Sequence, residues 1–257
     1  MMVKHLIILS SSYSTGRRIV MHFLDEDKDK FRAAVDAVSQ IYGGKEVQFS
    51  LHSIVTESAE WESVVESDPY FDDVQVVPTV EEFTDLIRRD RYFSGITVGK
   101  YILSMYHCTH TRLEKLVYFC YADYLCATKE KLFEDEIYAF DYGPVVKTVF
   151  TEYSRDSKTV PGAWLAPHTE VAPEKDVQEL PFGVHKMPFR SRIIFAEDGS
   201  RKIQSIDSTL ERLKDVPTQE LVNMTHREGS PWSQITPRGY HSLITDDIIL
   251  KGHSAEI

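Results

Sequence analysis

The sequence predicts an α+β protein with two domains. A small α/β N-terminal domain, residues 1–92, is followed by a mainly helical C-terminal domain, residues 93–257, which contains a short strand or hairpin. Strand-like and helical patterns alternate before residue 92, which is typical of an α/β unit, whereas longer helical patterns dominate afterwards. Gly95 breaks the pattern between the two parts, and 257 residues are enough for two domains.

The N-terminal domain alternates between the two kinds of element. Strands are predicted at residues 3–10, 46–55 and 74–78. Helical patterns extend over residues 19–44, 57–67 and 79–90. A Ser- and Gly-rich turn should join the first strand to the first helix, with Asp27 as its N-cap and Gly43 at its end. Thr79 and Glu82 form a capping box that opens the third helix.

The C-terminal domain carries the longer helical patterns. Helices are predicted at residues 97–107, 112–129, 144–154, 205–216 and 218–228. Apolar residues surround most of the circumference of 112–129, which indicates a central, buried helix. A short strand is expected before Pro144, which suits the first position of the next helix. A hairpin is expected around Asp198 and Gly199. Residues 156–190 form a long irregular excursion.

The charge is acidic and uneven. The net charge is −11, of which residues 1–92 carry −7, and the stretch 57–90 alone has 11 acidic and 2 basic residues. Such a surface repels nucleic-acid backbones, so general binding of DNA or RNA is not expected. The acidity serves solubility or presents a face to a basic protein partner.

The cysteines and the N-terminus indicate a cytoplasmic protein. Cys108, Cys120 and Cys126 are three in number and have no paired spacing, which argues against a disulfide framework and fits a reducing compartment. The apolar run after His5 is too short for a signal peptide or a membrane span, so no membrane association is expected. We interpret this run as a buried strand, and Cys120 and Cys126 as core residues.

Two segments could hold ligands. The turn Ser10–Arg18 combines hydroxyls, Gly16 and two arginines, and a helix after it could bind a phosphate; the alternative is a plain strand-to-helix turn. His107, Cys108 and His110 lie close together, but no second ligand pair accompanies them, so we predict no metal and no cofactor.

No catalytic residues are predicted. The sequence contains no nucleophile elbow, and a cysteine beside apolar residues is more often a core residue than a nucleophile. The acidic run Glu134–Glu136 could contain paired carboxylates, but acids ahead of a strand are usually solvated. We therefore do not expect an enzyme on these grounds.

The segment Thr225–Ile235 predicts a helix, a break and a second helix. Gly229 should end the first helix, Ser230 should cap the next, and Pro231 should occupy its first position. Trp232 is expected to fill the space between helices and to pack this joint against the helix containing Lys115. His226 is interpreted as a structural histidine or, alternatively, a contact for a partner.

Three separated pieces, Arg112–Val146, Ser205–Leu213 and Glu220–Trp232, together resemble the Panacea domain, the SocA-like antitoxin domain of toxin–antitoxin systems. The resemblance covers about residues 95–250. The matching positions are Lys115, Leu116, Tyr118, Leu132, Phe133, Tyr142, Gly143, Pro144, Val145, Thr225, His226, Pro231 and Trp232. Glu114 stands where the family commonly has glutamine, and Phe140 where it usually has tryptophan, which bears on the choice of partner more than on the fold.

The resemblance implies a prokaryotic or phage protein that neutralises a cognate toxin by direct complex formation. The toxin would be encoded by the adjacent gene. The family-motif or partner-binding residues are then Lys115, Leu116, Tyr118, Phe133, Phe140, Tyr142, Gly143, Pro144, Val145, Trp164, Thr225, His226, Pro231 and Trp232. Trp164 and Phe182 are included among the candidates because aromatic residues in loops are typical binding anchors.

Two alternatives remain open from sequence. One is a phage or mobile-element accessory protein that binds a host factor, which would share the binding physics of an antitoxin. The other is a nucleotide- or phosphate-binding enzyme that uses the N-terminal α/β unit through Ser10–Arg18. The resemblance assigns no role to residues 1–92.

Overall fold

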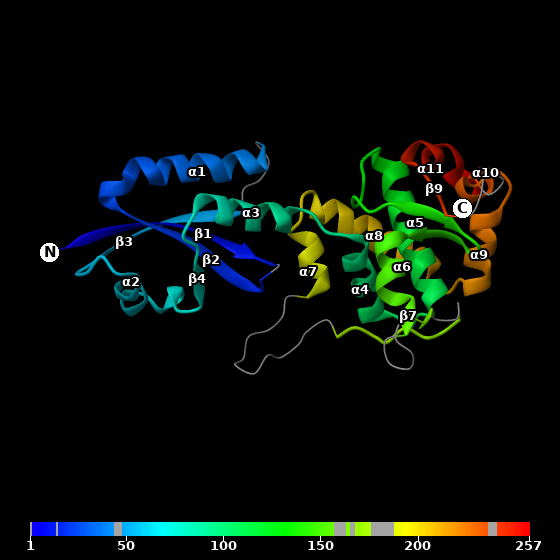
Figure 1. Cartoon of the computed structure of the whole chain (residues 1–257), viewed down its shortest axis with the longest axis horizontal. Helices are drawn as coiled ribbons and strands as arrows, with labels where there is room; N and C mark the ends of the chain where they lie inside the picture. Colours follow the sequence, from blue (N-terminus) through cyan, green and yellow to red (C-terminus); the bar gives the residue numbers. More distant parts are fainter. Residues whose placement is uncertain are drawn as a thin grey trace. The chain divides into compact units, whose positions relative to one another are not determined.

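A computed structural model describes residues 2–13, 15–43, 48–156, 163–164, 168–175, 188–235 and 241–257. The chain divides into two compact units, Met1–Tyr92 and Phe93–Ile257. The N-terminal unit contains a four-stranded sheet, and the C-terminal unit surrounds a long central helix (Figure 1). The protein is therefore a mixed α+β protein, as the sequence predicts.

The N-terminal unit is a sheet covered on both faces. Its strand order is β3-β1-β2-β4, and β4 runs parallel to β2 while the other neighbours are antiparallel. The strands are β1 (Val3–Ser12), β2 (Arg17–Leu24), β3 (Phe49–Thr56) and β4 (Val74–Val76). The helical elements are η1 (Asp25–Asp27), α1 (Lys28–Tyr42), α2 (Trp61–Ser67), η2 (Pro69–Phe71) and α3 (Val80–Arg91).

Side chains of β1 alternate between two small cores. Ile8 packs with α1 and α3 on one face of the sheet, whereas Ile7 and Leu9 pack with α2 and η2 on the other. Successive residues of a strand point to opposite faces, so a continuous apolar run is what a sheet covered on both sides requires. The hydroxyl of Thr79 accepts a hydrogen bond from the Glu82 amide (3.2 Å), which confirms the predicted cap of α3.

The helical interpretation of residues 19–24 is wrong, whereas the predicted N-cap at Asp27 is confirmed. Arg17–Leu24 forms β2, which pairs with β1 along its whole length, and the helix begins only at Lys28. The apolar residues of this segment satisfy a strand as well as a helix, and pairing with β1 decides between them. Gly16, at φ +68°, supports a hairpin turn instead of a strand-to-helix turn.

The C-terminal unit is built around α5 (His110–Thr128). Fourteen of its 19 residues are buried, which confirms the predicted central helix. The helices around it are α4 (Gly95–Met105), α6 (Lys147–Tyr153), α7 (Phe189–Ile194), α8 (Gly199–Leu213), α9 (Thr218–His226), α10 (Pro231–Ile235), α11 (Asp246–Gly252) and η4 (His253–Ala255). A small sheet has the order β6 (Gly143–Val146), β5 (Ile137–Phe140) and β9 (Ser242–Leu243). Two short strands, β7 (Arg155–Asp156) and β8 (Ala163–Trp164), pair separately.

Two local predictions in this unit are wrong. Pro144 lies in β6 and not at the start of a helix; β6 is an edge strand that pairs only with β5, where a missing amide hydrogen is tolerated. The segment around Asp198 and Gly199 joins α7 to α8 and is not a hairpin. A Cβ at Gly199 would lie 2.2 Å from the carbonyl oxygen of Ile193, so only glycine fits this tight connection.

No helix in the described part of the chain is long and apolar enough to cross a membrane.

Candidate functional site

Four motif residues from three separate segments meet at the turn between β5 and β6, which we call the motif turn. The ammonium of Lys115, on α5, donates a hydrogen bond to the carbonyl of Pro144. Gly143 has φ +103°, and a Cβ there would lie 2.5 Å from Oγ1 of Thr225 and 3.0 Å from Nζ of Lys115. The turn therefore requires glycine for its conformation and for its space. Lys115 is fully buried, and burial lowers its pKa to about 7, although Glu114 and Glu256 oppose the shift.

The Thr225–Ile235 segment forms the predicted joint with one difference. The hydroxyl of Ser230 accepts a hydrogen bond from the Ser233 amide (3.1 Å) and donates to the Thr225 carbonyl (2.7 Å), so Ser230 caps α10. Pro231 occupies the first position of α10, as predicted. However, α9 ends at His226, and Gly229 at φ +84° shapes the turn after it.

Trp232 is half-buried and packs on the small sheet. Its Nε1 donates to the carbonyl of Phe140 (2.7 Å), and its ring centroid lies 3.8 Å from that of His226. Nε2 of His226 contacts the carbonyl of Asp141 at 3.2 Å. Trp232 and His226 thus hold the end of β5 and the start of the motif turn, so both have a structural role in this unit.

A cavity of about 200 Å³ opens beside this turn. It lies between the first turns of α5 and the loop after β5. Phe150 of α6 and His241, directly before β9, complete its wall. The lining residues are His110, Thr111, Glu114, Lys115, Phe140, Asp141, Tyr142, Val145, Phe150 and His241. Four of the predicted motif residues line this cavity: Lys115, Phe140, Tyr142 and Val145. Pro144 borders it through its hydrogen bond to Lys115.

The cavity wall contains an unpaired buried carboxylate. Glu114 is 1% exposed, and neither of its carboxylate oxygens makes a hydrogen bond to any described residue. Nε2 of His110 lies 3.5 Å from Oε1 of Glu114 and is also without a hydrogen bond among the described residues. Burial raises the pKa of the Glu114 carboxyl, and the facing His110, Lys115 and Val146 backbone lower it only in part. A buried polar group left unpaired costs about 1–3 kcal/mol.

The outer wall of the cavity is aromatic. The Phe140 ring stacks on His241 with centroids 4.1 Å apart and an interplanar angle of 13°, and it lies 4.7 Å from the Phe150 ring. His241 is exposed and has φ +63°, an unusual conformation for a residue with a side chain. Its backbone amide donates to the Ala139 carbonyl (2.9 Å), which holds it in place. Tyr142, another aromatic residue of the lining, is 48% exposed.

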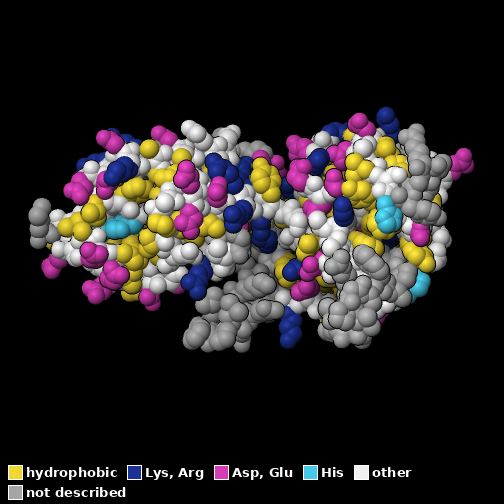
Figure 2. Space-filling view, in the orientation of Figure 1, with side chains coloured by type: hydrophobic (Ala, Val, Ile, Leu, Met, Phe, Trp, Pro, Cys, Tyr) yellow, Lys and Arg dark blue, Asp and Glu magenta, His cyan; other side chains and the backbone are white. Residues whose placement is uncertain are grey.

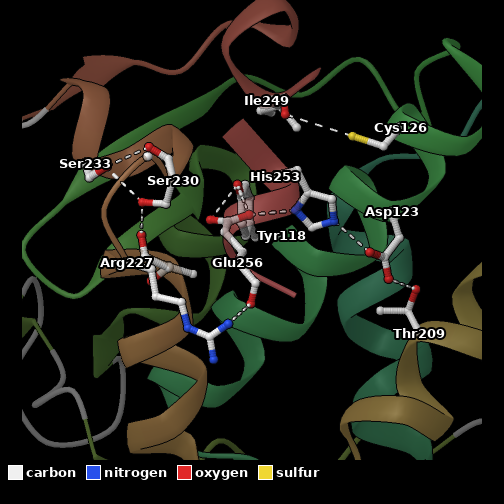
Figure 3. Close-up of polar contacts among 12 residues, drawn as sticks. Tyr118, Asp123, Cys126, Thr209, Arg227, Ser230, Ser233, Ile249, His253 and Glu256 are labelled. Atoms are coloured by element: carbon white, nitrogen blue, oxygen red, sulfur yellow. Dashed lines mark hydrogen bonds and ion pairs between the residues drawn. The ribbon is translucent and has the colours of Figure 1, made fainter. Parts of the chain in front are cut away.

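A buried polar network lies deeper in the unit (Figure 3). The hydroxyl of Tyr118 donates to the Glu256 carboxylate (2.9 Å), and the His253 imidazole lies 2.7 Å from both Glu256 and Asp123. Thr209 also donates to Asp123, at 2.6 Å. Burial lowers the pKa of His253, but its bonds to the two carboxylates outweigh this effect and raise the pKa to about 9. The network ties the C-terminal turn to α5 and α8.

The remaining predicted residues are distributed as follows. Leu116 and Phe133 are core residues and do not contact the cavity. The side chain of Trp164 and all of Phe182 lie outside the described residues. Cys108 and Cys120 are buried, and Cys126 is half-buried. Asp135 is not merely solvated, because its carboxylate accepts hydrogen bonds from the Gly95 amide (3.0 Å) and the Thr148 hydroxyl.

Sequence reasoning missed His110, Glu114, Phe150 and His241 as members of one site. His110 and Glu114 are four residues apart, which places both on one face of α5. That spacing, with an acid in an otherwise apolar helix, was the available signal. Phe150 and His241 carry no such signal, since only the fold brings them together. In the described ranges, no group of three or more His, Cys, Asp or Glu side chains could hold a metal ion.

Residues 113–233 match the model of a known family, described as "Antitoxin SocA-like, Panacea domain". This range contains most of α5, the small β5–β6 hairpin, α8, α9 and the first residues of α10, together with all the motif residues of the site. The matched segment lies in the C-terminal unit and agrees with the Panacea domain that the sequence predicts. No curated protein and no solved structure matches the chain.

Proposed function

We infer that this protein is the antitoxin of a toxin–antitoxin pair and neutralises a cognate toxin by binding it directly. The match of residues 113–233 to the SocA-like antitoxin family is the observation that carries this inference. The architecture of the site supports a binding role. The hydrogen bonds of Lys115 and Trp232 hold the motif turn in place, which is the work of a structural motif.

The surface around the motif turn is suited to a protein partner. Tyr142 and Leu243 are 48% and 44% exposed, and Asp141 beside Tyr142 is exposed as well. Figure 2 shows hydrophobic side chains and a histidine together on the visible face of this unit, with acidic and basic side chains spread around them. Large aromatic residues with a polar tip are frequent hot spots of protein interfaces. We call this surface, with Asp141, Tyr142 and Leu243, the rim of the motif turn. The toxin, encoded by the adjacent gene, would cover the rim with a basic and apolar surface.

Growth under co-expression tests the function. The adjacent gene is induced alone and together with this chain, and both growth and co-purification are measured. We expect the neighbour to stop growth alone, and the pair to grow and to co-purify. A neighbour that is harmless alone and does not co-purify would overturn the proposal. An accessory protein that binds a host factor would instead retain a host protein as its partner.

The nucleotide-binding alternative loses its structural premise. Arg17 and Arg18 lie in β2 and not at the start of a helix, so no helix N-terminus follows Ser10–Arg18. The Arg18 guanidinium donates to the Tyr70 carbonyl (2.5 Å), contacts Asp73 and covers the Tyr70 ring. A side chain with these partners stabilises the N-terminal unit itself.

A further inference from the structure

The cavity beside the motif turn has a composition that selects one kind of ligand. Its wall contains the buried carboxylate of Glu114, whose oxygens make no hydrogen bond to the described residues and whose Oε1 lies 3.5 Å from Nε2 of His110. Buried carboxylates are normally satisfied by donors, so this one is an acceptor in need of a partner. A donor that also carries positive charge satisfies it best, because charge-assisted hydrogen bonds are the strongest available.

The other walls favour a flat cation. Phe140 and Phe150 present aromatic rings to the cavity, and Tyr142 adds a third ring at its exposed side. A guanidinium group stacks on aromatic faces and donates two parallel hydrogen bonds to a carboxylate. An ammonium group can also approach aromatic rings and a carboxylate, but only as a point charge, without a flat face or two parallel donors. A cavity of about 150 Å³ can hold benzene, so 200 Å³ accommodates a group the size of an arginine side chain.

The nearby ammonium group of Lys115 does not hydrogen-bond to the Glu114 carboxylate. Lys115 also lines the cavity, but its ammonium is already bonded to the Pro144 carbonyl, and burial lowers its pKa to about 7. Asp141, exposed in the same lining, adds a second negative charge. The lining thus holds two carboxyl groups, Glu114 and Asp141, and one ammonium group that is already hydrogen-bonded. The left-handed backbone of His241, which stacks on Phe140, is a local strain of the kind found at ligand sites.

We propose that this cavity binds a guanidinium group, which pairs with the carboxylate of Glu114 and lies against the aromatic wall that Phe140, Phe150 and Tyr142 contribute to the cavity. The site belongs to the isolated chain. Its existence does not depend on whether a toxin is neutralised.

Calorimetric titration of the full chain with butylguanidinium tests the site. The matched variants are Glu114→Gln, which keeps the shape and removes the charge, and Glu130→Gln, which removes an exposed acid elsewhere in the unit. We expect saturable binding at one site, weakened about tenfold or more by Glu114→Gln and unchanged by Glu130→Gln. Equal binding to the Glu114→Gln variant, or no saturable binding to the wild-type chain, would overturn the proposal.

A second comparison uses only the unaltered chain, so it does not depend on the folding of any variant. Butylurea has the same flat shape as butylguanidinium but no charge, and butylammonium has the charge without the flat shape. Butylguanidinium should bind about tenfold more tightly than either compound. Butylurea binding as tightly as butylguanidinium would show that the cavity recognises shape alone, which contradicts the proposal.

The source of the guanidinium is distinguished by a further probe, acetyl-arginine methylamide, which carries the group as a peptide does. Binding of this probe at least as tight as that of butylguanidinium supports an arginine side chain of a protein partner. Binding of butylguanidinium alone supports a small guanidine. Either result requires Glu114, so loss of both in the Glu114→Gln variant is expected.

Discussion

At the scale of single residues, the motif turn is held by contacts that admit little substitution. Gly143 has a left-handed backbone and is also surrounded by the side chains of Thr225 and Lys115. Gly229, in the same unit, is left-handed too, but a Cβ there would meet only the Ala255 Cβ, at an ordinary 3.7 Å. The two glycines therefore separate the cost of backbone conformation from the cost of crowding.

Gly143→Ala should lower the free energy of unfolding more than Gly229→Ala. The conformational cost alone is about 1 kcal/mol at either site, and the clash at Gly143 should bring its total to about 3 kcal/mol. Urea denaturation followed by circular dichroism measures both values. An equal decrease in the free energy of unfolding for the two variants would show that the side chains of Lys115 and Thr225 move aside for a methyl group at little cost.

Trp232→Ala should lower the free energy of unfolding by about 2–3 kcal/mol. This is below the roughly 3–5 kcal/mol that is typical for truncation of a fully buried tryptophan, because the ring is only half-buried. Trp232→Phe, which keeps a ring and loses the bond to the Phe140 carbonyl, should cost about 1 kcal/mol. An unchanged melting temperature for Trp232→Ala, combined with lost toxin binding, would place the tryptophan in the interface.

At the scale of elements, the sequence predicts what depends on local pattern. Three features were predictable: the buried helix α5, the cap of α3 by Thr79 and the cap of α10 by Ser230. Each depends on a 3.6-residue period or a capping side chain, which a short stretch of sequence contains by itself. The hairpin partner β2 was not predictable, since its apolar residues fit either element and only pairing with β1 selects the strand. Pro144 suited a helix start equally well, and its place in an edge strand depends on β5.

The same distinction applies to the site. Lys115, Tyr142 and Gly143 were found because they form a recognisable motif. Glu114 was visible as a departure from the family pattern, but its burial without a partner is a property of the packed molecule. His241 and Phe150 come from segments far from α5 in sequence, and nothing in their local pattern indicates that they face Glu114.

The packing of η4 on α5 should depend on pH through His253. Its pKa in the folded state, about 9, lies above its ordinary value of 6.5. The contribution of the charged imidazole is thus complete below about pH 6.5 and is lost as the pH rises through 9. The difference in unfolding free energy between wild type and His253→Gln should shrink by up to about 3 kcal/mol between pH 6 and pH 10. Lys115 titrates in the same range with the opposite effect, but it is common to both proteins and cancels.

Denaturation of the two proteins at a series of pH values gives this difference directly. Asp123 is the other partner of His253, and Asp123→Asn in the same series should also flatten the pH dependence. A difference between wild type and His253→Gln that stays constant from pH 6 to pH 10 would mean that the imidazole is neutral in the folded protein.

At the scale of the whole molecule, the chain joins two units with separate cores. The antitoxin family match lies entirely within Phe93–Ile257. If this unit holds the toxin, residues 93–257 expressed alone should retain neutralisation, measured as growth in the presence of the toxin. Residues 1–92 expressed alone should not rescue growth. Rescue by the N-terminal unit alone would move the binding function away from the motif turn.

The affinity of the toxin for surface variants tests the central claim most directly, namely that the rim of the motif turn binds the partner. Tyr142→Ala removes an exposed aromatic ring and should leave stability within about 0.5 kcal/mol of wild type. Met105→Ala is the matched control, since Met105 is 44% exposed at the end of α4. The account predicts binding weakened about tenfold or more by Tyr142→Ala and unchanged by Met105→Ala, at equal melting temperatures. Wild-type affinity in the Tyr142→Ala variant would contradict it.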